Sequence, residues 1–299
     1  MIYHRPALLK ESVDGLNIRP DGIYVDATYG GGGHSEEILK RLKGGRLIAF
    51  DQDEDVRANI TDDKRLLLLN NNFRYLKNFL KYHQALPVDG IIADLGVSSH
   101  QFDVAERGFS TRYDAALDMR MNRNQKPTAA QILNDYSRQQ LSDVFRQYGE
   151  LSNSSLLADK IIGYRKSKKI ISGSDLKEAI AGLIDRRNED KFLAKVFQAL
   201  RIETNDELGA LKDFLVQSLM VLKKSGRLVV ISYHSLEDRM VKNFMRAGNF
   251  EGIPEKDFFG NTNVPFELIT RKPVTPDDKE ISENSRVRSA KMRIAEKKQ

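Results

Sequence analysis

Short apolar runs alternate with amphipathic stretches along the first third of the chain. The apolar runs are rich in Leu and β-branched residues, are bounded by Gly, Asp or Asn, and cover residues 23–29, 46–53, 65–73 and 88–99. Amphipathic stretches lie between them at 34–44 and 74–86. In the second stretch, Leu76, Phe79 and Leu80 have the three-and-four spacing of an apolar helix face. Strands that alternate with helices in this way predict a parallel, doubly wound α/β sheet.

The pattern changes between Ala105 and Ile202, where helix starts replace strands. Two of these starts have the Ser/Thr-x-x-Gln spacing of a capping box, at Thr128 and at Ser137. A third, at Thr204, is expected to open a long helix. One face of that helix carries a line of leucines, namely Leu208, Leu211, Leu215, Leu219 and Leu222.

Strand-like sequence returns after Gly226 with "RLVVISYHS". Near the end of the chain, "PFELITRKPV" and "AKMRIAEKK" are expected to pair as an antiparallel edge. A crossover of about a hundred residues between two strands is far longer than usual. The pattern therefore predicts a core made of residues 1–104 and 204–299, interrupted by an inserted all-helical domain over residues 105–203.

The composition narrows the class of protein. The 299-residue chain has a formal net charge of +6 and no cysteine, which excludes disulfides, thiolate metal sites and cysteine nucleophiles. A pI of about 9.2 suggests a polyanionic partner such as nucleic acid. The N-terminal sequence has no apolar signal segment, and no apolar run approaches ~18 residues. We therefore expect a cytoplasmic protein that does not bind a membrane.

Four consecutive glycines, Gly30 to Gly33, stand between the first predicted strand and the first predicted helix. Such a turn lets a ligand approach backbone N–H groups at a helix N-terminus. No Lys-Ser or Lys-Thr pair follows, which argues against a nucleoside triphosphate, and the Gly-x-Gly-x-x-Gly pattern of dinucleotide sites is incomplete. The alternative is a tight turn that binds nothing.

Acidic residues at the ends of two further strands point to the same edge of the sheet. Asp51 follows Gly30 by 21 positions, the spacing of an acidic residue that binds ribose hydroxyls, although Asp53 competes for this role. Asp94 ends the fourth strand, where it either faces the ligand crevice or satisfies loop amides. These features predict a nucleoside ligand, which leaves NAD(P) or S-adenosylmethionine. The antiparallel final strands favour the methyltransferase form of the fold.

Two other classes of function share parts of this pattern. An NAD(P)-dependent oxidoreductase would have the glycine turn. A non-enzymatic RNA-binding module would have the basic segments 164–169 and 286–298, but it would not need the turn together with Asp51. Further phosphate contacts are expected from three arginines near the start of the predicted insert, Arg112, Arg120 and Arg123.

Seven segments resemble one known family. They are "TYGGGGHS" (28–35), "DLGVSSHQFD" (94–103), "ERGFS" (106–110), "LDMRM" (117–121), "FQALRIETNDEL" (197–208), "SYHSLEDR" (232–239) and "ENSRVRSAKMRIAE" (283–296). In order and over nearly the whole chain, they resemble the bacterial small-subunit ribosomal RNA cytosine-N4 methyltransferases of the RsmH family, also called MraW. The departures are small: "AALDMRMN" lacks the usual Gly-Pro before the Leu, and Ser285 replaces a usual Pro.

The resemblance implies a Rossmann-like, class I methyltransferase fold with an inserted helical domain that recognises the substrate. It implies S-adenosyl-L-methionine as donor, and as substrate the N4 amine of a cytosine in the decoding region of 16S ribosomal RNA, in an assembled or assembling small subunit. The donor-binding residues carried over by motif are Gly32, Gly33, His34, Asp51, Phe73, Asp94 and Gln101. The five histidines have no ligand-like spacing, so no metal is expected. A monomer and a homodimer are both compatible with the sequence.

The catalytic assignment follows from the weak nucleophilicity of the cytosine amine, whose lone pair is delocalised into the ring. Acceptors for its N–H protons would favour attack on a methyl group. Asp94 is the best-placed carboxylate for this role, and His234 is a candidate proton acceptor beside Tyr233, which could stack on a base. The alternative for His234 is that it orders the turn before a helix that starts near Glu237.

Overall fold

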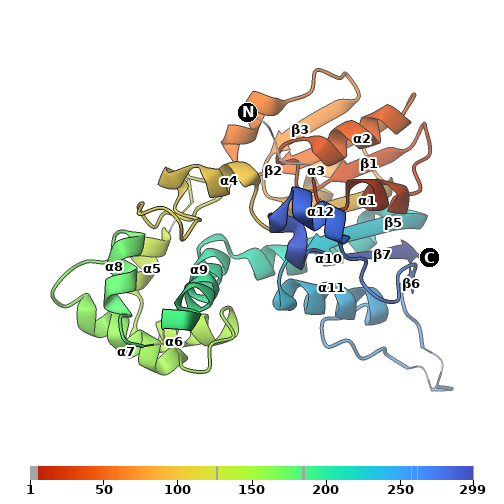
Figure 1. Cartoon of the computed structure of the whole chain (residues 1–299). Helices are drawn as coiled ribbons and strands as arrows, with labels where there is room; N and C mark the ends of the chain where they lie inside the picture. Colours follow the sequence, from red (N-terminus) through yellow and green to blue (C-terminus); the bar gives the residue numbers. More distant parts are fainter. Residues whose placement is uncertain (1–5, 126, 184–185, 257, 261, 299) are drawn as a thin grey trace. The chain divides into compact units, whose positions relative to one another are not determined.

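The computed structural model describes residues 6–125, 127–183, 186–256, 258–260 and 262–298. The chain folds into two compact units, one made of Met1–Gly96 with Leu208–Gln299 and the other of Val97–Glu207. In Figure 1 the chain runs from red and orange strands into green helices and returns, in cyan and blue, to the sheet. The residues expected to form an insert, 105–203, lie within the second unit.

A seven-stranded sheet forms the centre of the first unit, in the order β3-β2-β1-β4-β5-β7-β6. The strands are β1 (Ile23–Asp26), β2 (Arg46–Asp51), β3 (Leu66–Asn70), β4 (Val88–Asp94), β5 (Leu222–Ser232), β6 (Phe266–Leu268) and β7 (Lys291–Lys297). β1 to β5 are parallel, whereas β7 is antiparallel to both of its neighbours. This confirms the predicted parallel sheet and the antiparallel pairing of the last segments. The fold is Rossmann-like, and its seventh strand is antiparallel, as expected for the methyltransferase form of the fold.

Helices cover both faces of this sheet (Figure 1), which is why its central strands are apolar without alternation. They are α1 (Leu9–Gly15), α2 (Gly33–Arg41), α3 (Leu76–Tyr82), α10 (Glu207–Val221), α11 (Ser235–Ala247) and α12 (Asp278–Glu283). On β4, Ile92 packs into a cluster that includes Ile38 of α2. Its neighbour Ile91 packs into a second cluster, with Phe214 of α10 and Phe244 of α11.

The second unit is built from helices around a core of its own. They are α4 (Ser99–Asp103), α5 (Ala129–Asp135), α6 (Arg138–Gln147), α7 (Ser154–Tyr164), α8 (Gly173–Ala179) and α9 (Glu189–Asn205). Phe145, Leu157 and Leu200 are fully buried in this core. The capping boxes predicted at Thr128 and Ser137 are confirmed, because each hydroxyl and the Gln three residues later exchange hydrogen bonds with the backbone. In the part of the chain that the structure describes, no helix has the length and apolar character needed to cross a bilayer.

The helix start predicted at Thr204 is wrong. α9 continues through Thr204 to Asn205, and Asp206 ends it in a left-handed conformation with φ 48°. Thr204 is buried in the last turn of α9, so it is not the residue that caps α10. The leucine pattern also overruns the end of the next helix. Leu222 belongs to β5, where it pairs with Val88 of β4.

Candidate functional site

Three aspartates end neighbouring parallel strands at one edge of the sheet. Asp26 ends β1, Asp51 ends β2 and Asp94 ends β4. Asp26 pairs in register with Ala49 and with Ile92, so the other two aspartates lie two residues beyond the end of β1. β1 stands between β2 and β4 in the sheet. The loop that follows β1 therefore starts between Asp51 and Asp94, at the carboxyl ends of the strands, where ligands bind in such sheets.

Asp51 joins the glycine turn to the tip of β2. The Gly30 N–H donates to Oδ2 of Asp51 over 2.8 Å, and the Asp53 N–H donates to Oδ1 over 2.9 Å. Burial raises the pKa of Asp51 to about 6. Each carboxylate oxygen has a further lone pair, so Asp51 can also accept hydrogen bonds from ligand hydroxyls. Asp53, the competing candidate, caps the next turn by accepting the Asp55 N–H.

The glycine turn is shaped both by packing and by open space. Gly32 has φ +83°, and a Cβ there would lie 2.8 Å from the Tyr29 hydroxyl oxygen. A Cβ on Gly33 would lie 2.3 Å from Cγ of Pro6. Beside Gly30, in contrast, the nearest atom to a built Cβ is 3.9 Å away. α2 begins at Gly33 without a side-chain cap, so the N–H groups of its first turn have no partner inside the helix.

An aromatic side chain stands near this edge, after β3. Asn70, the last residue of β3, donates from Nδ2 to the backbone oxygen of Asp51 over 3.1 Å. Phe73 follows at the start of the short helix η2 (Phe73–Tyr75) and is partly buried. Its ring meets that of Phe214 edge-on, with 5.2 Å between centroids. An apolar ring close to polar strand tips suits a ligand with both aromatic and hydroxyl parts.

Asp94 lies between a tyrosine and a histidine. Its Oδ1 accepts the Tyr233 hydroxyl over 2.8 Å, and its Oδ2 lies 3.9 Å from Nδ1 of His34. His34 is buried, with Nε2 3.2 Å from the backbone oxygen of Ala7. Burial raises the pKa of Asp94 to about 6. Burial lowers the pKa of His34, against the opposing effect of Asp94, so this imidazole is neutral at pH 7.

Asp26 is the most buried of the three carboxyl groups, with 1% of its surface exposed. Its Oδ2 accepts the Ser35 hydroxyl over 2.7 Å and its Oδ1 accepts the Thr28 N–H over 3.1 Å. The Thr28 hydroxyl in turn accepts the Asp94 N–H over 2.7 Å. Burial raises the pKa of Asp26 to about 6. The sequence analysis missed Asp26, although its position at the end of the first strand, four residues before Gly30, is a signal that could have identified it.

His234 caps the N-terminus of α11. Its Nδ1 accepts the Glu237 N–H over 3.4 Å, and its Nε2 lies 3.2 Å from Oε1 of Glu237 without hydrogen-bond geometry. The Tyr233 N–H donates to Oε2 of Glu237 over 3.0 Å. These contacts order the turn after β5, which is the alternative that the sequence offered for His234.

Gln101 belongs to the second unit. It forms a capping box at the start of α4, where its Oε1 accepts the Ser98 N–H over 3.1 Å and its own N–H donates to Oγ of Ser98 over 3.2 Å. The other predicted site residues lie in the first unit, namely Gly32, Gly33, His34, Asp51, Phe73, Asp94 and His234.

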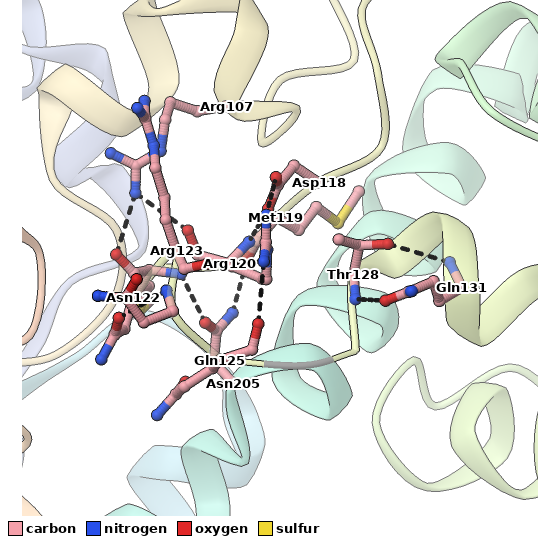
Figure 2. A network of polar contacts seen from close by, with 12 residues as sticks. Arg107, Asp118, Met119, Arg120, Asn122, Arg123, Gln125, Thr128, Gln131 and Asn205 are labelled. Carbon is pink, nitrogen blue, oxygen red and sulfur yellow. Dashed lines mark hydrogen bonds and ion pairs between the residues drawn. The ribbon is translucent and has the colours of Figure 1, made fainter.

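The loop before α5 uses its arginines to hold itself together. Figure 2 shows Arg120 paired with both carboxylate oxygens of Asp118, at 2.7 Å each, while its Nη1 donates to the backbone oxygens of Arg123 and Gln125. Arg107 is buried and donates to two backbone oxygens of the same loop, at 3.0 and 3.1 Å. The guanidinium of Arg120 thus has four hydrogen bonds within the loop, and its contact with RNA phosphate stays a prediction.

Comparisons with known proteins agree with the resemblance seen in the sequence. The MraW methylase family matches residues 1–298. The ribosomal RNA small subunit methyltransferase H of Bacteroides thetaiotaomicron is 58% identical over 299 residues, covering 100% of this chain and 98% of that protein. Its namesake in Flavobacterium johnsoniae is 56% identical over 298 residues, covering 99% and 98%. Among solved structures, an rRNA methylase of Streptococcus thermophilus has a TM-score of 0.44 at 13% identity, covering 100% of this chain and 99% of that one.

The buried carboxyl of Asp26 predicts a pH-dependent difference in stability. Its pKa is 3.8 ordinarily and about 6 when folded, so the folded chain binds more protons between pH 4 and 6 and loses stability as the pH rises through this window. Asp26→Asn should match the parent chain at pH 4 and exceed its free energy of unfolding by about 2–3 kcal/mol at pH 7. Urea unfolding at the two pH values measures this.

Asp62→Asn, at an exposed carboxyl, is the matched control and should show no such pH-dependent gain. An Asp26→Asn variant that is less stable than the parent at pH 7 would mean that the Ser35 and Thr28 hydrogen bonds outweigh the desolvation of the charge.

Proposed function

The chain belongs to the MraW methylase family, and on that premise we propose that it transfers a methyl group from S-adenosyl-L-methionine to the N4 amine of a cytosine in the decoding region of small-subunit (16S) ribosomal RNA. The relatives named above are ribosomal RNA small subunit methyltransferases, which supports the choice of substrate. The observation that carries the proposal is the convergence of Asp51, Asp94 and the glycine turn at one edge of the sheet.

The residues at this edge fit the donor. Asp51 would accept the two ribose hydroxyls, because its oxygens keep lone pairs beside the bonds from Gly30 and Asp53. The N–H groups of the first turn of α2, after Gly32, would bind the donor's carboxylate. Phe73 would pack on the adenine, and Gln101, carried over by motif, would be a further donor-binding residue. When bound, the donor supplies an electrophilic methyl group on a positively charged sulfur.

Asp94 would act on the cytosine amine. As the N4–methyl bond forms and the sulfur–methyl bond breaks, positive charge develops on N4, and a carboxylate that accepts an N4 hydrogen bond stabilises it. One N4 proton then passes to Asp94. A pKa of about 6 leaves this group ionised at pH 7 but basic enough to take the proton. His34 is neutral and adds no competing positive charge. His234 would serve by ordering the turn that carries Tyr233.

The second unit would be the substrate-recognition domain. In the segment 164–169, Lys168 is paired with Glu178 over 3.2 Å, whereas Lys166 and Lys169 are exposed. Near the C-terminus, Arg288 is also exposed. Exposed cations of this kind can neutralise RNA phosphates, and we expect binding that weakens as salt rises. The substrate would be a ribosomal subunit, assembled or assembling.

The direct test is methylation of free 16S rRNA, isolated small subunits and whole ribosomes with radiolabelled donor, followed by nucleoside analysis. We expect N4-methylcytidine from at least one of the three substrates. Calorimetry with S-adenosylhomocysteine and with NAD should show binding of the former alone. Label at another atom or base, or binding of NAD alone, would contradict the proposal.

Asp51→Ala should weaken donor binding. Loss of a charge-assisted hydrogen bond costs about 1.5–3 kcal/mol, which is roughly a tenfold to hundredfold rise in Kd. The affinity of the parent chain should itself fall as the pH is lowered through about 6, where Asp51 becomes protonated, and the variant should lack this dependence. Calorimetry with S-adenosylhomocysteine at pH 5 and 7.5 measures both effects. Asp62→Ala, at an exposed carboxyl, should bind like the parent, and unchanged affinity in Asp51→Ala would remove Asp51 from the donor site.

Asp94→Asn should separate binding from chemistry. The amide keeps one acceptor but loses the negative charge, which matters most when N4 becomes cationic. Single-turnover methylation should slow by on the order of a hundredfold, while donor Kd changes little. A weak donor Kd with a near-normal chemical step would leave Asp94 as a donor-binding residue only.

A further inference from the structure

Tyr233 is fixed against Asp94 by three contacts. Its hydroxyl donates to Oδ1 of Asp94 over 2.8 Å. Its backbone N–H donates to Oε2 of Glu237 over 3.0 Å. Its ring lies against Gly96, which has φ +109° and where a Cβ would be 3.3 Å from the ring. These contacts favour a role for the Tyr233 hydroxyl at Asp94 over a role for the ring in base stacking.

The hydrogen bond from Tyr233 makes the two oxygens of Asp94 unequal. Oδ1 is occupied by the tyrosine hydroxyl. Oδ2 lies 3.9 Å from Nδ1 of His34, which is beyond hydrogen-bond distance. The Asp94 backbone is held as well, because its N–H donates to Oγ1 of Thr28 over 2.7 Å. Oδ2 therefore keeps both of its lone pairs for an N–H group of a substrate, whereas one lone pair of Oδ1 is taken by the tyrosine hydroxyl.

We infer that Tyr233 is the positioning residue of this site: its hydroxyl holds Asp94 ionised and turned so that Oδ2 meets the cytosine amine. This inference rests on the proposed function for its substrate. Tyr233 acts through Asp94 and need not touch the cytosine itself.

The charges around Asp94 explain why a hydroxyl partner is needed. Asp26 of β1 and Glu237 of α11 both oppose ionisation of Asp94, as does its own burial. His34 of α2 and the Tyr233 hydroxyl favour it. Of these two groups, the Tyr233 hydroxyl is the one within hydrogen-bond distance of Asp94, at 2.8 Å against 3.9 Å for His34. Burial, followed by Asp94, Glu237 and Glu280 of α12, raises the pKa of Tyr233, so its proton stays on the oxygen and remains available to Asp94.

Tyr233→Phe tests the inference, because it removes the hydroxyl and keeps the ring against Gly96. Without this donor the pKa of Asp94 should rise, so the acidic limb of the pH dependence of kcat should move up by about one pH unit or more. We expect kcat to fall about fivefold or more at pH 6, with donor Kd unchanged, and to approach the parent value at pH 8.5. A structural defect alone would not be corrected by raising the pH.

Tyr24→Phe is the matched control. Tyr24 is buried in β1 and its hydroxyl accepts the Arg19 N–H over 2.7 Å, so this variant also loses one hydrogen bond. It should lower stability without moving the pH profile. A uniform drop in kcat at all pH values for Tyr233→Phe, or an unchanged profile, would overturn the positioning role.

Carbon-13 NMR of the Asp94 carboxyl provides a readout that needs no substrate. With labelled aspartate and Asp94→Asn to assign the signal, the titration midpoint should be higher in Tyr233→Phe than in the parent and in Tyr24→Phe. Equal midpoints would overturn the inference even if the methylation activity is confirmed. A raised midpoint in a chain that does not methylate 16S rRNA would overturn the proposed function and leave the coupling of Tyr233 to Asp94 standing.

Discussion

Three aspartates lose their solvation at the carboxyl ends of neighbouring parallel strands. The arrangement of the loops at these strand ends depends on this constraint. A buried carboxylate is costly unless donors surround it, and each of these aspartates takes its donors from a different segment. Asp26 binds the start of α2 through Ser35, Asp51 binds the glycine turn, and Asp94 binds the turn after β5 through Tyr233. The hydrogen bonds that compensate the buried carboxylates therefore also fix the positions of these segments.

These hydrogen bonds do not fully compensate the loss of solvation of the carboxylates, because burial still raises the pKa of each to about 6. The burial of these carboxylates destabilises the folded chain at neutral pH. Carboxyl groups that titrate close to neutral pH are typical of functional sites. The glycine turn reflects both demands. A side chain at Gly32 would clash with the Tyr29 hydroxyl, and one at Gly33 would clash with Pro6. Gly30, in contrast, borders open space next to Asp51.

The second unit divides its positive charge between structure and surface. Arg107 and Arg120 donate to backbone carbonyls of a loop that would otherwise lack donors, and Lys168, in the turn after α7, is paired with Glu178 of α8. Lys166 and Lys169 remain exposed. Net charge alone therefore overstates how many cations are available to a polyanion, because a buried guanidinium such as that of Arg107 contributes to the net charge but does not reach the surface.

The sequence by itself determined the features that depend on local periodicity. It predicted the parallel strands, the antiparallel end pair, the capping boxes at Thr128 and Ser137, and the strand ends that carry Asp51 and Asp94, because each of these elements has a local pattern of periodicity or spacing. It failed where long-range contacts override local preference. Burial draws Thr204 into α9, and pairing with Val88 draws Leu222 into β5. Only tertiary structure decided that Tyr233 meets Asp94, 139 positions away, because the sheet places β5 next to β4.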